Sequence, residues 1–150
     1  MKIFNGTDEL RAAKGSRLGV SDWLRIDQTQ IDAFAGATGD HQWIHVDAEK
    51  AKDGPFGTPI AHGFLTLSLV SVIGWQVYQV KGVRMTINYG LNKVRFIAPV
   101  PVGSRVRGSI ELVEVSDVDG GVQVTNKVTI EIEGSERPAV VAESLLRYYV

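Results

Sequence analysis

Asp40 and His45 are the pair of residues in this 150-residue chain whose types and spacing suggest chemistry. The carboxylate and the imidazole stand five positions apart, next to the turn residue Gly39. A carboxylate and a histidine that converge on one water molecule can remove a proton from it and deliver a proton elsewhere. This is the minimum equipment for adding water to an activated double bond or for removing it.

A second segment, His62-Gly63, follows His45 by seventeen residues and begins a long apolar stretch. The N–H groups in the first turn of a helix have no partner within the helix, and the helix dipole favours negative charge beside them. The backbone N–H of Gly63 could therefore hold the charge that develops on a carbonyl oxygen. Together the two segments indicate a site for hydration or dehydration.

In order and spacing, residues 34–40 (FAGATGD), 44–47 (IHVD) and 59–63 (PIAHG) resemble the signature of the MaoC-like hydratases. These are the (R)-specific enoyl-CoA hydratases of the hot-dog superfamily. Gln42-Trp43 stands where the family usually has Asn-Pro, a departure that bears on substrate preference more than on chemistry. The chain is similar to short single-domain bacterial members, including mycobacterial ones, and to the nodulation protein N group. The resemblance covers nearly the whole chain.

The resemblance implies hydration of a trans-2-enoyl-CoA to an (R)-3-hydroxyacyl-CoA, with Asp40 and His45 acting on one water and Gly63 on the thioester carbonyl. Ser71 and His62 are the expected substrate-binding residues. Ser71 lies eight positions after Gly63, on a similar helix face; in related hydratases a serine at the matching position lies near the catalytic pair. His62 supports the start of the helix. Coenzyme A, or an acyl carrier protein, arrives with the substrate, so no bound cofactor is expected.

Each assignment has an alternative. Gly39-Asp40 is also a common turn sequence, and His45 between two aliphatic residues is also typical of a core histidine. His41 and His45 are four apart, but they follow a helix-ending glycine, lack the glutamate of the zinc-protease pattern and have no cysteine nearby, so no metal site is expected. A hot-dog thioesterase, or a non-catalytic module that binds acyl thioesters or a protein partner, remains open as an alternative function.

The composition fits one domain over residues 1–150, because 44% apolar content is enough for a proper core. A formal net charge of −1 gives no electrostatic case for binding nucleic acid or an anionic membrane. The chain has no cysteine, and its first residues contain no apolar signal core, so a cytoplasmic protein is expected.

Capping residues and hydrophobic periodicity predict the elements. Residues 63–78 are expected to form one helix that is apolar on almost every side, too short to span a bilayer and hence surrounded by protein. The other elements are expected as helices at 7–14 (capped by Thr7), from Asp27 or Thr29 to Gly39, and after Asp47 to residue 52; loops at 39–47 and 53–59; and strands at 23–26, 83–98, 105–112, 122–133 and 139–149.

The long strand must slip by a residue around positions 90–92, because its apolar residues change phase there. One apolar helix and a late run of strands predict an α+β fold, and the resemblance selects the hot-dog fold: a curved antiparallel sheet wrapped around a long buried helix. Apolar surface left over by this packing, and the usual family unit, predict a homodimer with the sheets joined edge to edge.

Overall fold

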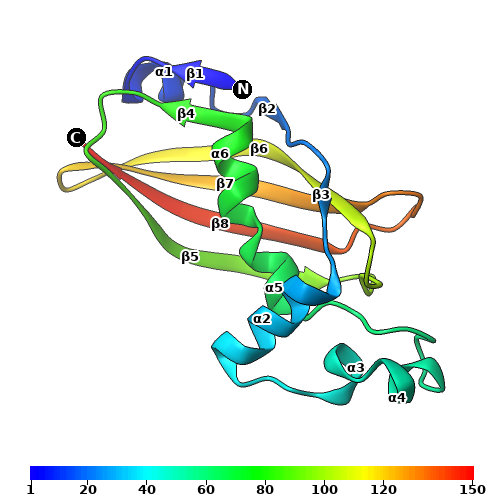
Figure 1. The fold of residues 1–150 in the computed structure, drawn as a ribbon. Helices are drawn as coiled ribbons and strands as arrows, with labels where there is room; N and C mark the ends of the chain where they lie inside the picture. Colours follow the sequence, from blue (N-terminus) through cyan, green and yellow to red (C-terminus); the bar gives the residue numbers. More distant parts are fainter.

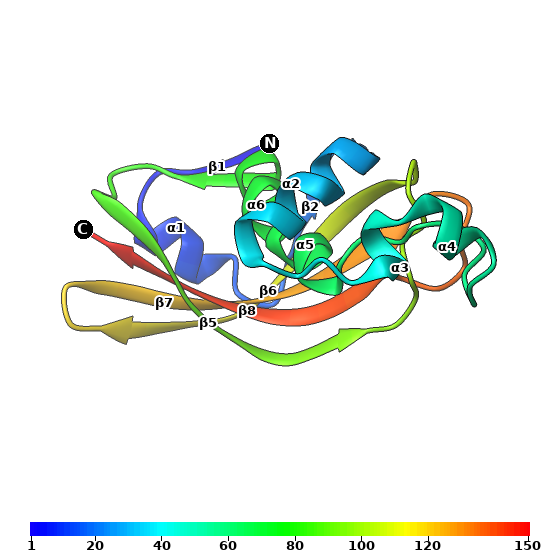
Figure 2. The same ribbon diagram turned by 60° about the horizontal axis from the view of Figure 1, so that its bottom comes forward.

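A long, curved antiparallel sheet lies along one side of the computed structural model, which describes residues 1–150, and the helices gather on its inner face (Figures 1 and 2). The strands are β1 (Lys2–Phe4), β2 (Arg17–Val20), β3 (Leu24–Arg25), β4 (Tyr78–Val80), β5 (Met85–Phe96), β6 (Arg105–Val118), β7 (Gly121–Ile132) and β8 (Val140–Tyr149). The helices are α1 (Thr7–Ala12), α2 (Gln28–Thr38), α3 (Trp43–Val46), α4 (Ala48–Lys52), α5 (Gly63–Ser68) and α6 (Val70–Val77).

The strand order in the sheet is β2-β6-β7-β8-β5, and β3 also pairs with β6. All of these pairings are antiparallel, and α5 and α6 cross the concave face as the predicted central helix (Figure 1). The predicted hot-dog arrangement is confirmed. A parallel pair, β1 with β4, was not predicted, because strands of three residues are too short to show an alternating pattern.

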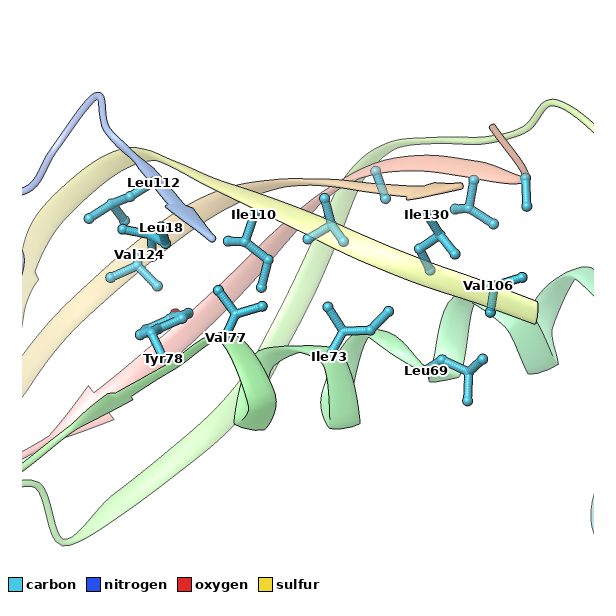
Figure 3. Close-up of a cluster of buried hydrophobic side chains, with 14 of the residues drawn as sticks. Leu18, Leu69, Ile73, Val77, Tyr78, Val106, Ile110, Leu112, Val124 and Ile130 are labelled. Carbon is cyan, nitrogen blue, oxygen red and sulfur yellow. The ribbon is translucent and has the colours of Figure 1, made fainter. Parts of the chain in front are cut away.

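Four side chains at a spacing of four residues form the buried stripe of the central helix: Leu65, Leu69, Ile73 and Val77. Figure 3 shows Ile73 and Val77 directed at the side chains of the sheet. Gly108 of β6 allows this close approach, since a methyl group at that position would lie 2.6 Å from Cγ2 of Ile73. The helix is therefore seated directly on the sheet.

The prediction of one continuous helix from residue 63 to 78 is wrong. The helix is interrupted at Leu69, whose N–H bonds to the Thr66 carbonyl, while the Ser68 hydroxyl donates to the Leu65 carbonyl at 2.6 Å. A serine that bonds back to the preceding turn in this way commonly bends a helix. The helix is also not enclosed within the subunit, because Phe64 is 68% and Trp75 64% exposed.

The predicted caps agree with the structure at two of three places. Asp27 and Asp47 cap α2 and α4 through bonds to the N–H groups of Gln30 and Lys50. Gly6, in place of Thr7, caps α1, which ends at residue 12. The predicted loop 39–47 contains the short helix α3, which has too few residues to show periodicity.

The predicted slip in the long strand is confirmed, because the pairing of β5 with β8 shifts register between Asn88 and Gly90 and again between Asn92 and Arg95. No helix of the structure is long and apolar enough to cross a bilayer.

Candidate active site

Asp40 owes its position to the end of α2. Gly39 adopts a left-handed conformation with φ of 82°, and its N–H bonds to the Ala35 carbonyl at 2.8 Å. Glycine tolerates this conformation without steric cost, so the helix stops there and the chain turns away. The Asp40 carboxylate follows at once, exposed, and it accepts a bond of 3.3 Å from the N–H of Gln42.

His45 is buried on α3, and its ring is fixed by the backbone of residue 60. Nδ1 lies 2.7 Å from the carbonyl oxygen of Ile60, and the N–H of Ile60 bonds in turn to the Ile44 carbonyl. A carbonyl oxygen can only accept, so Nδ1 carries the hydrogen and the neutral ring has its lone pair on Nε2. Gln28 of α2 holds the same turn by donating to the His45 carbonyl at 2.8 Å.

His62 joins the two halves of the site. Its Nε2 donates to the backbone carbonyl of Asp40 at 2.9 Å, and its ring stacks on the ring of His45 with centroids 3.9 Å apart. The ring of Phe34 packs against it from α2. His62 therefore supports both predicted catalytic residues, which agrees with its expected place at the start of the helix.

Asp40, His45 and His62 each offer one ligand atom, and these atoms lie within 4.8 Å of one another. Such a cluster could be a metal site. However, one nitrogen of each ring is already bonded to a carbonyl, and the rings are inclined by only 23°. The lone pair of an imidazole nitrogen lies in the plane of its ring, so stacked rings do not direct their lone pairs at a common centre. The arrangement suits proton transfer better than metal binding.

A cavity of about 260 Å³ lies next to His45. Gly63 and Thr66 of α5 line it together with Phe56 and Phe96, and most of the remaining wall is aliphatic. The ring of Phe96 covers Gly63 so closely that a methyl group on Gly63 would lie 3.0 Å from it. The predicted catalytic residues His45 and Gly63 thus meet at one apolar cavity.

Ser71 does not line this cavity. It lies on α6 beside two further cavities, of about 310 and 90 Å³, which share Val70, Ser71 and Asn88 and lie between α6 and β5. Trp43, at the departure from the family signature, packs against Gly54 and under the ammonium group of Lys50. Trp43, the first residue of α3, is thus held against the α4 segment and does not line the cavity of about 260 Å³.

Phe56, Thr66 and Phe96 are among the residues of the cavity wall that escaped prediction. Phe56 belongs to the loop 53–59 and Phe96 to the far end of β5, and no local pattern brings either to the site. Thr66 carried a signal, since it is a polar residue in an otherwise apolar stretch of helix.

Residues 10–133 match the family model described as MaoC like domain. The chain is 58% identical over 149 residues to 3-hydroxyacyl-thioester dehydratase Z of Mycobacterium tuberculosis (strain ATCC 25618 / H37Rv), covering 99% of each chain. It is 50% identical over 131 residues to nodulation protein N of Rhizobium leguminosarum bv. viciae, covering 85% of this chain and 81% of that one. The solved structure of the (R)-hydratase from A. caviae involved in PHA biosynthesis matches with a TM-score of 0.70 at 28% identity, over 89% of this chain and 94% of that chain.

Proposed function

The chain belongs to the MaoC-like dehydratase family, and we propose that it catalyses the reversible, (R)-specific hydration of trans-2-enoyl-CoA to (R)-3-hydroxyacyl-CoA. Hydration or dehydration of an acyl thioester is supported by the full-length similarity to a 3-hydroxyacyl-thioester dehydratase and by the structural match to an (R)-hydratase.

In this mechanism Asp40 and His45 hold one water over the C2–C3 double bond. The water oxygen adds to C3 as one of the two side chains takes a proton, and a proton is delivered to C2. The thioester carbonyl, which becomes enolate-like in the transition state, accepts a hydrogen bond from the N–H of Gly63. The two side chains act on one water and form a coupled pair, so their roles as acid and base need not divide cleanly.

The observation that carries this proposal is the orientation of the His45 ring. Because Nδ1–H is bonded to the Ile60 carbonyl, Nε2 is left as the nitrogen that can accept a proton from a water. A carboxylate oxygen of Asp40 lies within 4.8 Å of a ring nitrogen of His45, and His45 lines an apolar cavity. A base, a carboxylate and an apolar cavity for a flat enoyl group are what the reaction needs.

We place the acyl chain along the helix, in the second cavity, which shares no lining residue with the cavity next to His45. Phe64, the neighbour of Gly63, lines the 310 Å³ cavity, which continues to Ser71. Ser71 is therefore proposed to contact the acyl chain, whereas His62 acts by holding the Asp40 loop. Coenzyme A, or an acyl carrier protein, stays outside and leaves with the product, so the mechanism uses no bound cofactor.

A homodimer is proposed as the working unit. β5 is an edge strand of the sheet, and its free edge is a template for pairing with another chain. Its large apolar side chains are exposed in the single subunit, as is Phe64: Met85, Ile87, Tyr89, Leu91 and Phe96. An exposed apolar strand of this kind favours a second copy that covers it.

Crotonyl-CoA tests the activity directly. Loss of the conjugated chromophore without release of free thiol indicates a hydratase, and release of free thiol indicates a thioesterase. If neither signal is seen, the protein is a non-catalytic binding module. Asp40→Asn and His45→Gln should each lower hydration by about 10² to 10⁴. His41→Gln and Asp53→Asn are matched controls on exposed residues nearby and should leave the rate unchanged. Near-normal turnover by a folded Asp40 or His45 variant would remove that residue from the mechanism.

The stereochemistry of the product tests the family mechanism. Asp40, just after α2, and His45, on α3, stand five residues apart, and we expect them to approach the enoyl group from one face. Addition should therefore be syn and, on the family resemblance, give the (R) product. An (S)-specific 3-hydroxyacyl-CoA dehydrogenase coupled to the reaction should therefore reduce no nicotinamide while the enoyl chromophore disappears. Rapid reduction would show the (S) product and overturn the proposal.

A further inference from the structure

The hydroxyl group of Thr66 is buried beside the catalytic cavity without a hydrogen-bond partner. Thr66 is 1% exposed, and its Oγ1 makes no hydrogen bond to any other group of the protein. A buried hydroxyl that makes no hydrogen bond lowers stability, because it has lost its bonds to water. Such a group is expected where a bound molecule completes its hydrogen bonding.

Ser68, on the same short helix, shows what a serine or threonine usually does in this position. Its hydroxyl bonds back to the Leu65 carbonyl, which satisfies it within the fold. Thr66 makes no such bond and lines the 260 Å³ cavity instead. Its hydroxyl is therefore available to a ligand, whereas that of Ser68 is already used.

Within that cavity, the polar side chains of the wall are those of His45 and Thr66, and the others are hydrocarbon, aromatic or glycine. A ligand oxygen placed there finds few donors. His45 is occupied with the water in the proposed mechanism, which leaves Thr66 for another oxygen of the substrate.

Thr66 follows Gly63 by three residues, so the two lie on the same side of α5, and both line the cavity. We propose that Thr66 Oγ–H is a second donor to the thioester carbonyl oxygen, together with the N–H of Gly63. A carbonyl oxygen has two lone pairs and accepts both bonds. This assignment rests on the proposed hydratase function and adds a catalytic residue to it.

Both bonds strengthen as the carbonyl oxygen becomes negative, so the Thr66 hydroxyl acts mainly on the transition state. Thr66→Val keeps the shape of the side chain and removes the hydroxyl, whereas Thr66→Ser keeps the hydroxyl. With crotonyl-CoA we expect Thr66→Val to lower kcat by about 10²-fold, the usual effect of losing one such donor. KM should change by less than about threefold, and Thr66→Ser should retain most of the rate. Equal losses in both variants, or normal kcat in Thr66→Val, would overturn the assignment.

Thermal unfolding separates this role from a structural one. Because the hydroxyl is unpaired in the free protein, Thr66→Val removes an unsatisfied group and should leave the melting temperature unchanged or raise it. A hydroxyl that held the fold together, for instance by turning to the unpaired Nδ1 of His62, would lower the melting temperature when removed. A lower melting temperature together with slow turnover would therefore count against the assignment.

A bound chromophore reports the hydrogen bond without turnover. In the Asp40→Asn background, a 2,4-dienoyl-CoA should bind intact, and donors to its carbonyl should polarise it and shift its absorption to longer wavelength. We expect a smaller shift in Asp40→Asn/Thr66→Val than in Asp40→Asn alone; an equal shift would refute the contact. Hydration of crotonyl-CoA by the native protein tests the underlying function separately. If the native protein hydrates crotonyl-CoA and the Thr66→Val variant does so equally fast, the role of Thr66 is refuted and the proposed hydratase activity stands.

Discussion

Replacing Gly108 by alanine should destabilise the protein, because the side chain of Ile73 on α6 lies directly against this residue of β6. The new methyl group would lie 2.6 Å from Cγ2 and 2.7 Å from Cδ1 of Ile73, about 1 Å closer than carbon atoms normally pack. Ile73 is fully buried, and the backbone of Gly108 is held on both sides by bonds to Ser21. Neither group can move freely, so we expect a loss of about 1–3 kcal/mol in the free energy of unfolding, as for other overpacked cores.

A double-mutant cycle tests whether contact between the new methyl group and Ile73 causes this loss of stability. Ile73→Ala alone should cost about 2–5 kcal/mol, because it leaves a cavity. In Gly108→Ala/Ile73→Ala the added methyl group occupies part of that cavity, so the double variant should lose less stability than the sum of the two single losses. The difference should be about 1–2 kcal/mol. Gly36→Ala is the control, since this exposed glycine in α2 has open space around it and should gain about 0.5–1 kcal/mol.

Urea unfolding followed by circular dichroism, at one fixed protein concentration, measures all four values. α6 continues from α5, which carries Gly63, so Gly108→Ala should also slow hydration of crotonyl-CoA. A Gly108→Ala variant as stable as the native protein, or single losses that simply add in the double variant, would refute the close seating of α6 on the sheet.

The double variant Asp40→Asn/His45→Gln should be hardly slower than the slower single variant, because both residues act on one water in the proposed mechanism; multiplied losses in the rate assay would indicate independent roles. The hydroxyl groups of Tyr78 and Tyr148 are buried and form a hydrogen bond of 2.8 Å, and burial raises the pKa of both phenols above the ordinary value of 10. The unfolded chain ionises these groups near pH 10 and the folded protein does not, so the stability that they contribute should be complete below pH 10 and decrease as the pH rises further. Urea unfolding at pH 8 and 10.5 should show this decrease, and Tyr148→Phe should reduce it. Dialysis against EDTA should leave turnover intact; a loss that zinc restores would reveal a metal. Sedimentation should give twice the 16.4 kDa chain mass, and Ile87→Lys on the edge strand should shift the protein towards monomer; an active native monomer would exclude the proposed dimer.

The sequence alone determined the features that depend on neighbouring residues. Asp27 and Asp47 predict the starts of the helices that they cap, Gly39 predicts the end of α2, and alternating apolar residues indicate the long strands. The signature around Asp40 and His45 identified the family, which the comparisons then showed. These signals are readable because caps and periodicity act over a few residues.

The tertiary structure decided what depends on segments that are distant in the sequence. The tautomer of His45 is set by the carbonyl of Ile60, and the Asp40 loop is held by His62. The break at Leu69 depends on where the Ser68 hydroxyl turns, which the sequence pattern does not show. Phe96 reaches the cavity because β5 pairs with β8 through two register shifts. Such contacts result from the packing of the whole chain, in which the hydrophobic pattern selects a buried face but the meeting of particular atoms depends on every element around them.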